Sequence, residues 1–117
     1  MPELHDVSRF DLERVGDAKL TFTDLAYDQP GKRLLYVACA EASPDAVRDG
    51  PVSGVALGVL DDEPRYGLVV DENGALLTDK IEGFVPDPAR EGRFYAVVDV
   101  DDPSRPAELL ELTVEGL

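Results

Sequence analysis

The sequence predicts an all-β, β-propeller-like fold with about two four-stranded blades per chain. Nearly every apolar run is short, strand-like and bounded by Pro, Gly, Asp or Asn, the residues that end strands and form turns. No segment carries a sustained helical period of apolar residues. The pattern of the first half of the chain also recurs in the second half at an interval of 59 residues.

The first repeated unit, residues 19–75, is expected to contain four strands. Lys19–Asp28 alternates apolar residues with threonines, and the turn sequence Gln-Pro-Gly-Lys follows it. Arg33–Ala42 is apolar on both faces, which is typical of a strand covered on both sides. Two further strands, Ser53–Asp62 and Pro64–Asp71, are joined by an acidic turn.

The second unit, residues 79–117, repeats this order with three strands instead of four. They are expected over Lys80–Asp87, Arg93–Asp101 and Ala107–Gly116. The N-terminal segment Arg9–Val15 alternates apolar and charged residues. We therefore expect residues 8–18 to supply a strand that completes the last blade, in the same chain or in a neighbouring one. Residues 1–117 then form a single all-β domain.

A constant offset of 59 residues aligns the two units. It matches Asp28 with Asp87, Tyr36 with Tyr95 and Pro44 with Pro103. A four-stranded unit that recurs at this spacing is typical of a propeller blade. Because blades stack face to face, the middle strands of both units are expected to be buried on both sides.

Two blades cannot close a ring, and each would leave an apolar face in water. We therefore expect the chain to associate with itself. Three copies would form a six-bladed ring through heterologous contacts that close by rotation, so a homotrimer is favoured. The alternative is a compact eight-stranded sandwich or barrel that needs no partner.

The composition is strongly acidic. Asp and Glu number 25 against 11 Lys and Arg, which gives a formal net charge of −14. Such a surface repels phosphate backbones and anionic membranes, so we expect neither nucleic acid nor a membrane as partner. One interpretation of the acidity is solubility or adaptation to high salt. The alternative is that the acidic residues bind a cation. The chain shows no signal-peptide pattern and no apolar run near the ~20 residues of a membrane span, which predicts a cytoplasmic protein.

A resemblance to a known family is carried by four stretches, LTFTDLAYD, LLYVACAEASPDAVRDGPVSGVALGVL, KIEG and AVVDVDDPSRPAELLEL. They resemble the C-terminal part of a bacterial family of propellers of unknown function, which is similar in look to phytase-like esterase and lactonase six-bladed propellers. The resemblance covers Phe10–Val114 and implies a propeller fold. Family members are longer, and the chain lacks their preceding blades. It is then a fragment, an engineered piece, or a short form that rebuilds the ring by association.

Acidic residues are the main candidates for a site. In the predicted hairpin of the second unit, the start of one strand lies beside the end of the next, which brings Glu82 near Asp99 and Asp101. The same construction in the first unit places Asp24 near the end of the strand bearing Glu41. Crowded carboxylates suit Ca²⁺, so Glu82, Asp99, Asp101 and Asp24 are candidate calcium ligands. The alternative is that the Asp-rich segment is a turn in which Asp and Ser bond their own backbone.

No other catalytic constellation is predicted. His5 is the single histidine, Cys39 lies in an apolar run, and no phosphate loop or zinc cluster is present. We expect a structural or binding module of unknown ligand that assembles into a ring and has no catalytic residues. One alternative, implied by the resemblance, is a Ca²⁺-dependent hydrolase of the esterase or lactonase kind. Another is a propeller piece without a ligand.

Overall fold

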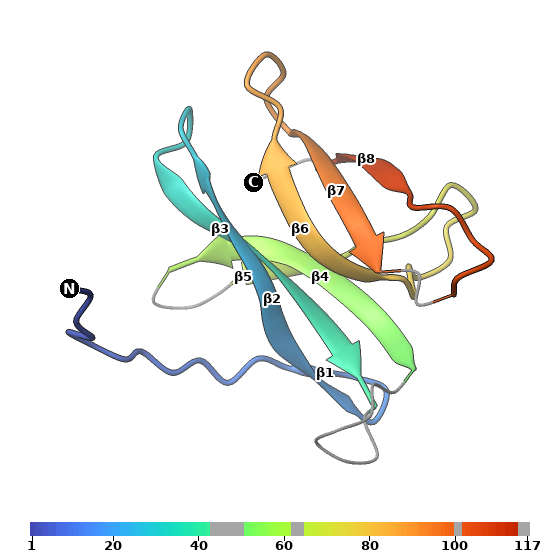
Figure 1. Ribbon diagram of the computed structural model, residues 1–117, viewed down its shortest axis with the longest axis horizontal. Coiled ribbons are helices and arrows are strands. Elements are labelled where there is room, and N and C mark those ends of the chain that lie inside the picture. The colour runs from blue at the N-terminus through green and yellow to red at the C-terminus, as the bar shows by residue number, and fades with distance from the viewer. Residues whose placement is uncertain (43–50, 62–64, 100–101, 115–117) are drawn as a thin grey trace.

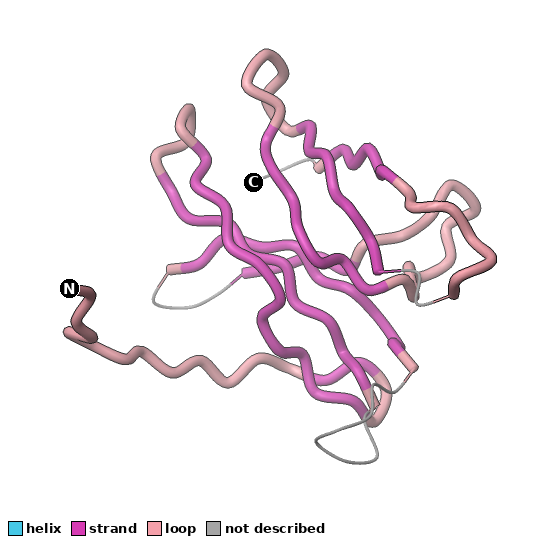
Figure 2. The backbone as a smooth tube through the Cα atoms, in the orientation of Figure 1, coloured by secondary structure: helices cyan, strands magenta, loops and turns pink. Residues whose placement is uncertain are grey.

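The computed structural model describes residues 1–42, 51–61, 65–99 and 102–114. Within these ranges the chain forms eight β-strands and no helix, as Figures 1 and 2 show. The strands form two separate sheets, in which neighbouring strands run antiparallel. The prediction of an all-β chain is confirmed.

Both sheets are meanders, in which each strand pairs with the one before it in the chain. Sheet 1 contains β1 (Arg14–Val15), β2 (Ala18–Asp28), β3 (Arg33–Glu41), β4 (Val52–Leu60) and β5 (Arg65–Leu68). Sheet 2 contains β6 (Lys80–Pro86), β7 (Arg93–Asp99) and β8 (Leu109–Thr113). Seven of the eight predicted strands therefore lie close to their expected bounds, because alternation and turn residues are local signals.

The N-terminal strand differs most from its prediction. It is confined to Arg14–Val15 and pairs with β2 of the same chain. Gly16 has a φ of 62°, a left-handed conformation that glycine adopts without strain, and it starts a two-residue turn back into β2. Sheet 1 consequently has five strands, where four were expected. The pairing of residues 8–18 with a neighbouring chain stays a prediction.

A β-bulge occurs at a corresponding place in β2 and in β6. The register of β2 against β3 shifts at Thr23, and the register of β6 against β7 shifts at Glu82. These two bulged residues are 59 positions apart in the sequence. A bulge leaves one residue unpaired and increases the local twist. The β2–β3 and β6–β7 hairpins thus carry a bulge at equivalent positions.

The loops that follow these strands differ in length by one residue. Asp28 pairs with Arg33 across residues 29–32, whereas the Asp87 N–H donates to the Arg93 carbonyl across residues 88–92. The offset that relates the two hairpins therefore grows from 59 before the loop to 60 after it.

This change corrects the constant alignment of the two units. By strand pairing, Tyr36 of β3 corresponds to Ala96 of β7, and Tyr95 corresponds to Leu35. The expected match of Tyr36 with Tyr95 is therefore wrong by one residue. Because side chains alternate along a strand, the two tyrosines occupy non-equivalent faces of their hairpins.

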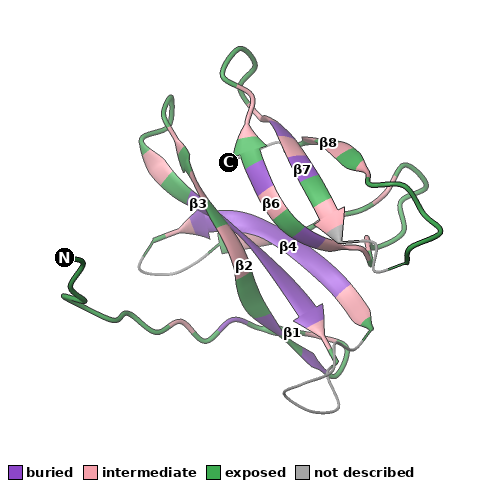
Figure 3. Ribbon diagram, in the orientation of Figure 1, coloured by how far each residue is buried: buried purple, intermediate pink, exposed green. Residues whose placement is uncertain are grey.

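The main hydrophobic core, called the shared core here, lies between the two sheets. Sheet 1 contributes Leu35, Val37, Cys39, Val55, Leu57 and Val59, and sheet 2 contributes Ile81, Phe84, Phe94 and Ala96. The two sheets differ in how far they are buried. Figure 3 shows β3 and β4 almost continuously buried, whereas β6 and β7 are buried only in part. The sheets are thus held together by apolar packing, which removes these side chains from water.

A second cluster lies on the outward face of sheet 1, the face remote from sheet 2. It contains Leu12, Ala18, Leu20, Tyr36, Ala38, Ala40 and Ala56. Part of its cover comes from the N-terminal stretch, which Figure 1 shows running along this side of the sheet. Phe10 packs edge-on against Phe22 at 5.9 Å between ring centroids. β3 is therefore buried on both sides, as predicted.

Within the described parts of the chain, β7 is covered on one face only. Phe94 and Ala96 are buried in the shared core, whereas Val97 between β6 and β8 is half exposed. The expectation that the middle strand of the second unit is buried on both sides is wrong for the single chain. The reason is that Val97 and its neighbours on the outward face of sheet 2 face solvent.

Candidate functional site

The structure places three of the four predicted calcium ligands in the two hairpins. Asp24 follows the bulge in β2, and Glu82 is the bulged residue of β6. Asp99 ends β7, where its backbone pairs with Lys80, so the backbone of Glu82 lies near this end of β7. Asp101 and the side chain of Asp99 lie outside the described part of the structure.

Asp24 makes a contact between the sheets. Its Oδ2 accepts a 2.8 Å hydrogen bond from the backbone N–H of Phe84 in β6. Hydrogen bonds to a carboxylate are stronger than those between neutral groups. The half-buried Asp24 side chain therefore fixes β2 against β6, a structural role that uses one of its carboxylate oxygens.

Lys80 supplies a positive charge beside Glu82. Its Nζ lies 3.3 Å from Glu41 Oε2 and 3.6 Å from Glu82 Oε1. The side chains of Lys80 and Glu41 are largely shielded from solvent, with exposed fractions of 25% and 19%. An ammonium group thus occupies the space between the two carboxylates, and a divalent cation bound there has to compete with it.

The described residues include no group of three or more His, Cys, Asp or Glu side chains that could hold a metal ion. The predicted calcium site includes Asp101 and the Asp99 side chain, which lie outside the described residues. Calcium binding by this set of acids therefore stays a prediction.

Cys39 of β3 lies beside Thr23, the bulged residue of β2. The Thr23 hydroxyl is 4.0 Å from its Sγ and 3.4 Å from the Val37 carbonyl oxygen. Burial raises the pKa of the Cys39 thiol, although hydrogen bonds and the nearby Lys80 ammonium act in the opposite direction. A buried, protonated thiol is a poor nucleophile. The geometry therefore supports a packing role for Cys39.

The described end of the Asp-rich segment forms a turn. Asp102 Oδ1 accepts hydrogen bonds from the Ser104 hydroxyl at 2.7 Å and the Ser104 N–H at 2.9 Å. These two bonds lower the pKa of Asp102. The backbone N–H of Arg105 also donates a hydrogen bond to the Asp102 carbonyl. Asp102 thus has the turn chemistry that the sequence offered as the alternative to metal binding.

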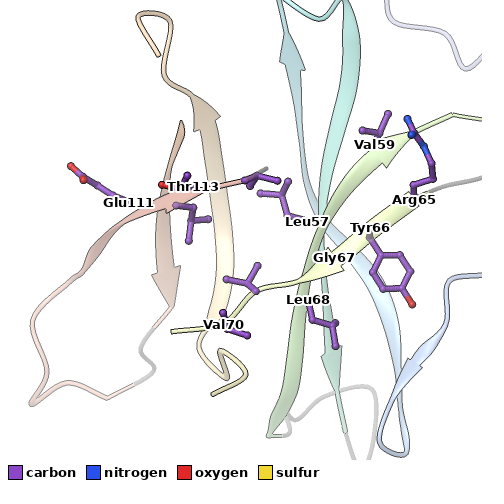
Figure 4. A pocket seen from close by; sticks show the side chains of 12 residues that line it. Leu57, Val59, Arg65, Tyr66, Gly67, Leu68, Val70, Glu111 and Thr113 are labelled. Atoms are coloured by element: carbon purple, nitrogen blue, oxygen red, sulfur yellow. The ribbon is translucent and has the colours of Figure 1, made fainter. Parts of the chain in front are cut away.

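A groove of about 420 Å³ lies between β5 of sheet 1 and β8 of sheet 2 (Figure 4). Leu57 and Val59 of β4 and Leu112 of β8 are among the apolar residues that line it. Two charged residues of opposite sign, Arg65 and Glu111, also line the groove. Sequence reasoning missed this groove, although the signal was present: the second unit has one strand fewer than the first.

A smaller cavity of about 260 Å³ lies between the β2–β3 and β6–β7 loops. Two of its arginines form ion pairs: Arg33 Nε lies 3.1 Å from Asp28 Oδ2, and Arg93 Nη1 lies 3.4 Å from Glu111 Oε2. These two guanidinium groups therefore already have carboxylate partners within the chain.

The outward faces of the two sheets both expose large apolar side chains. The outward face of sheet 1 exposes Phe22, Leu25, Tyr27, Leu34 and Leu68. The outward face of sheet 2 exposes Val85, Val97 and Leu109. Contiguous apolar side chains on a surface mark interaction sites more often than scattered ones do. These two faces are therefore the best candidates for a functional surface.

The described residues contain no helix that could cross a lipid bilayer. No curated protein and no solved structure matches the chain at a significant level. One family profile, described as "Family of unknown function (DUF6910)", matches residues 1–103. Because this match covers most of the chain, the protein belongs to the family of unknown function DUF6910.

Proposed function

We propose that the chain is a structural or binding module that assembles head to tail with copies of itself into a propeller-like ring. One observation carries the proposal. Five of the apolar residues exposed on the two outward faces correspond, by strand pairing, to residues that are buried in the shared core: Phe22, Leu25, Leu34, Val97 and Leu109.

The correspondence follows from the hairpin registers. The two bulges relate β6 to β2, and the loop lengths relate β7 to β3. β8 corresponds to β4, because Leu109 pairs with Val97 as Leu57 pairs with Val37. We infer that sheet 2 is a second copy of the unit formed by β2, β3 and β4.

The outward face of sheet 2 then matches the core face of sheet 1. Val97 is 50% exposed, and its counterpart Val37 is 0% exposed. Leu109 is 66% exposed, and its counterpart Leu57 is 3% exposed. These residues are of the kind that the shared core buries, but the described part of the chain provides nothing to cover them.

The outward face of sheet 1 matches the core face of sheet 2 in the same way. Leu25 is 51% exposed, and its counterpart Phe84 is 4% exposed. Leu34 is also partly exposed, whereas its counterpart Phe94 is buried. Complete burial of one such side chain contributes about 1.5–3 kcal/mol.

The two faces are therefore complementary to each other, and neither is complementary to itself. Sheet 2 of one copy can pack on sheet 1 of the next, as sheet 1 packs on sheet 2 within the chain. Such a contact is heterologous and forms a ring when the rotation closes. Propellers have about four to eight blades, so two to four copies of two sheets fit this range and three copies give six.

The charge of the chain predicts how the assembly responds to salt. A net charge of −14 on each copy opposes association at low ionic strength. Salt screens this repulsion and leaves the apolar contact in place. We expect the assembled fraction to increase with ionic strength, which is opposite to the behaviour of an interface held by ion pairs.

The test is the solution mass, measured by light scattering over a range of protein and salt concentrations, with and without Ca²⁺. We expect a closed species of two to four chains, with the trimer favoured. A chain that stays monomeric under all these conditions would overturn the proposal. A mass that changes only when Ca²⁺ is added would instead favour the calcium-dependent alternative.

Two variants test the head-to-tail geometry. Val97→Glu places a charge on the outward face of sheet 2, and Leu25→Glu does so on the outward face of sheet 1. Each variant alone should be monomeric, whereas an equimolar mixture should form one-to-one dimers that do not grow, because each partner retains one intact face. Gln29→Glu, which adds the same charge to an exposed loop residue outside both faces, is the control and should assemble as the unmodified chain does.

A further inference from the structure

The groove between β5 and β8 has the position of a missing strand. In sheet 1, β5 pairs with β4 on the side away from β3. In sheet 2, β8 corresponds to β4, and the described residues place no strand on its outer side. The groove lies along this open edge, with Leu57 and Val59 of the facing sheet as part of its wall. An added strand would occupy the place next to β8 that β5 occupies next to β4.

We propose that this groove binds residues 8–13 of a second copy of the chain, which add to the edge of β8 as an extended strand. This inference rests on the proposed head-to-tail assembly and identifies a second contact within it. An open strand edge presents a row of unpaired backbone donors and acceptors, and an extended segment can satisfy them.

The composition of the segment matches the groove. Residues 8–13 read Ser-Arg-Phe-Asp-Leu-Glu, so Phe10 and Leu12 fall on one face of a strand. That face can pack against the apolar wall that Leu57, Val59 and Leu112 form. The intervening charged residues would point to the outward side of sheet 2, where Glu111 lies.

In its own chain the segment lies on the opposite side of sheet 1 from the groove. Phe10 and Leu12 pack on the outward face of sheet 1, whereas the groove opens on the side of the shared core. The outward face of sheet 1 is also the face that meets sheet 2 of the next copy in the proposed assembly. The segment therefore lies at the contact between copies, close to the partner's β8.

Polar and apolar contacts hold the segment in its own chain. The Glu13 carbonyl accepts a 2.9 Å hydrogen bond from the Leu20 N–H, and the Glu13 side chain is hydrogen-bonded to Tyr66. Residues 1–9 are exposed, and the ion pair between Asp11 and Lys19 has a 3.1 Å contact between exposed side chains, which contributes little. Leu12 is buried and Phe10 is half-buried, so their packing is the main contribution lost on release. The apolar groove replaces this packing, and the β8 edge adds backbone hydrogen bonds.

The test blocks the strand without removing its apolar side chains. Proline lacks the backbone N–H, and alternate residues of an edge strand face opposite sides. The double variant Ser8→Pro/Asp11→Pro places one proline at an even and one at an odd position, so one of them faces β8 in either register. The matched control is Glu3→Pro/Asp6→Pro, which has the same spacing and lies outside the segment.

The readouts are solution mass and hydrogen exchange. In the assembled, unmodified chain, the amides of residues 8–13 and 109–113 should become protected relative to a dilute monomeric sample. Ser8→Pro/Asp11→Pro should weaken assembly at least about tenfold and lose this protection, while Glu3→Pro/Asp6→Pro assembles normally.

Two results would overturn the inference, and they can be told apart. If the unmodified chain assembles but residues 8–13 stay unprotected, or the blocking variant assembles as well as the control, strand addition is wrong and head-to-tail assembly stands. If the unmodified chain is monomeric at every concentration, both proposals fail together.

Discussion

The two sheets have closely related strand patterns and very different surroundings. In sheet 1, β3 has six consecutive buried residues, because sheet 2 covers one face and the N-terminal stretch contributes to the cover of the other. In sheet 2, β7 alternates between buried Phe94 and Ala96 and the half-exposed Val97. The difference lies in what is packed on each sheet and much less in the strands themselves.

This comparison shows that burial in such a protein is a property of the stack of sheets. Val37 and Val97 are both valines at corresponding positions, and among the described residues only Val37 has another sheet packed on it. The distribution of apolar residues along a strand indicates whether one or both of its faces are suited to burial. The pattern of β7 suits a strand covered on both sides, which is the physical basis of the assembly proposed here.

The largest expected effect comes from placing a charge at these two positions. Val37→Glu buries an unpaired carboxylate in the shared core and should lower the free energy of unfolding by more than about 4 kcal/mol. Val97→Glu should change the stability of the monomer by less than about 0.5 kcal/mol. Urea unfolding of dilute protein measures both, and similar losses at the two positions would contradict the comparison.

Truncation of a corresponding pair gives the next largest effect. Phe94→Ala leaves a cavity in the shared core and should destabilise the chain by about 3–5 kcal/mol. Leu34→Ala, at the corresponding position on the outward face of sheet 1, should cost about 1 kcal/mol in the monomer. The loss for Leu34→Ala should grow with protein concentration if this face is buried by assembly, and thermal unfolding at several concentrations measures this dependence.

A polar link distinguishes the contact within the chain from the proposed contact between chains. Asp24 accepts a hydrogen bond from the Phe84 N–H, while its counterpart in sheet 2 is Gly83, which has no side-chain acceptor. Asp24→Ala should therefore cost about 1–3 kcal/mol of stability. Asp24→Asn keeps an acceptor oxygen and should lose less. An equal loss for both variants would show that the charge, and not the hydrogen bond, stabilises the sheet pair.

Much of the fold could be predicted because its signals are local. Alternating residues and turn sequences placed seven strands close to their observed bounds and predicted the hairpin that brings Glu82 to the end of β7. The N-terminal strand was predicted too long, because a glycine turn at Gly16 folds only its last two residues onto β2. The β6–β7 loop has one residue more than the β2–β3 loop. A constant offset of 59 therefore misaligns β3 with β7 by one residue.

The candidate site was less predictable, because its partners are not visible in a pattern of acidic residues. Asp24 is held by a backbone N–H, and any residue type supplies one. Glu82 forms an ion pair with Lys80, two positions away in the sequence, and a pattern of acidic residues alone does not reveal this counter-ion. The groove between β5 and β8 depends on how two sheets pack, and only the unequal strand count of the two units pointed to it.

The smallest expected effect concerns the two tyrosines that a constant offset aligns. Tyr36 is fully buried, and its hydroxyl has no hydrogen-bond partner among the described residues, whereas the Tyr95 hydroxyl donates to Asp87 Oδ2 at 3.0 Å. Tyr36→Phe removes an unsatisfied polar group and should raise the free energy of unfolding by about 1 kcal/mol. Tyr95→Phe removes a made hydrogen bond and should lower it.

The buried hydroxyl of Tyr36 should also make the stability of the chain depend on pH in the alkaline range. Burial raises the pKa of Tyr36 to about 12, above the value of about 10 of an unfolded chain. Between these values the unfolded chain releases the phenolic proton and the folded chain retains it, so the contribution of Tyr36 is fully present below pH 10 and is lost as pH rises toward 12. Urea unfolding across this range should show a steeper loss of stability for the unmodified chain than for Tyr36→Phe. If the two profiles run parallel, the Tyr36 hydroxyl is solvated, and the outward face of sheet 1 is more open to water than its packing indicates.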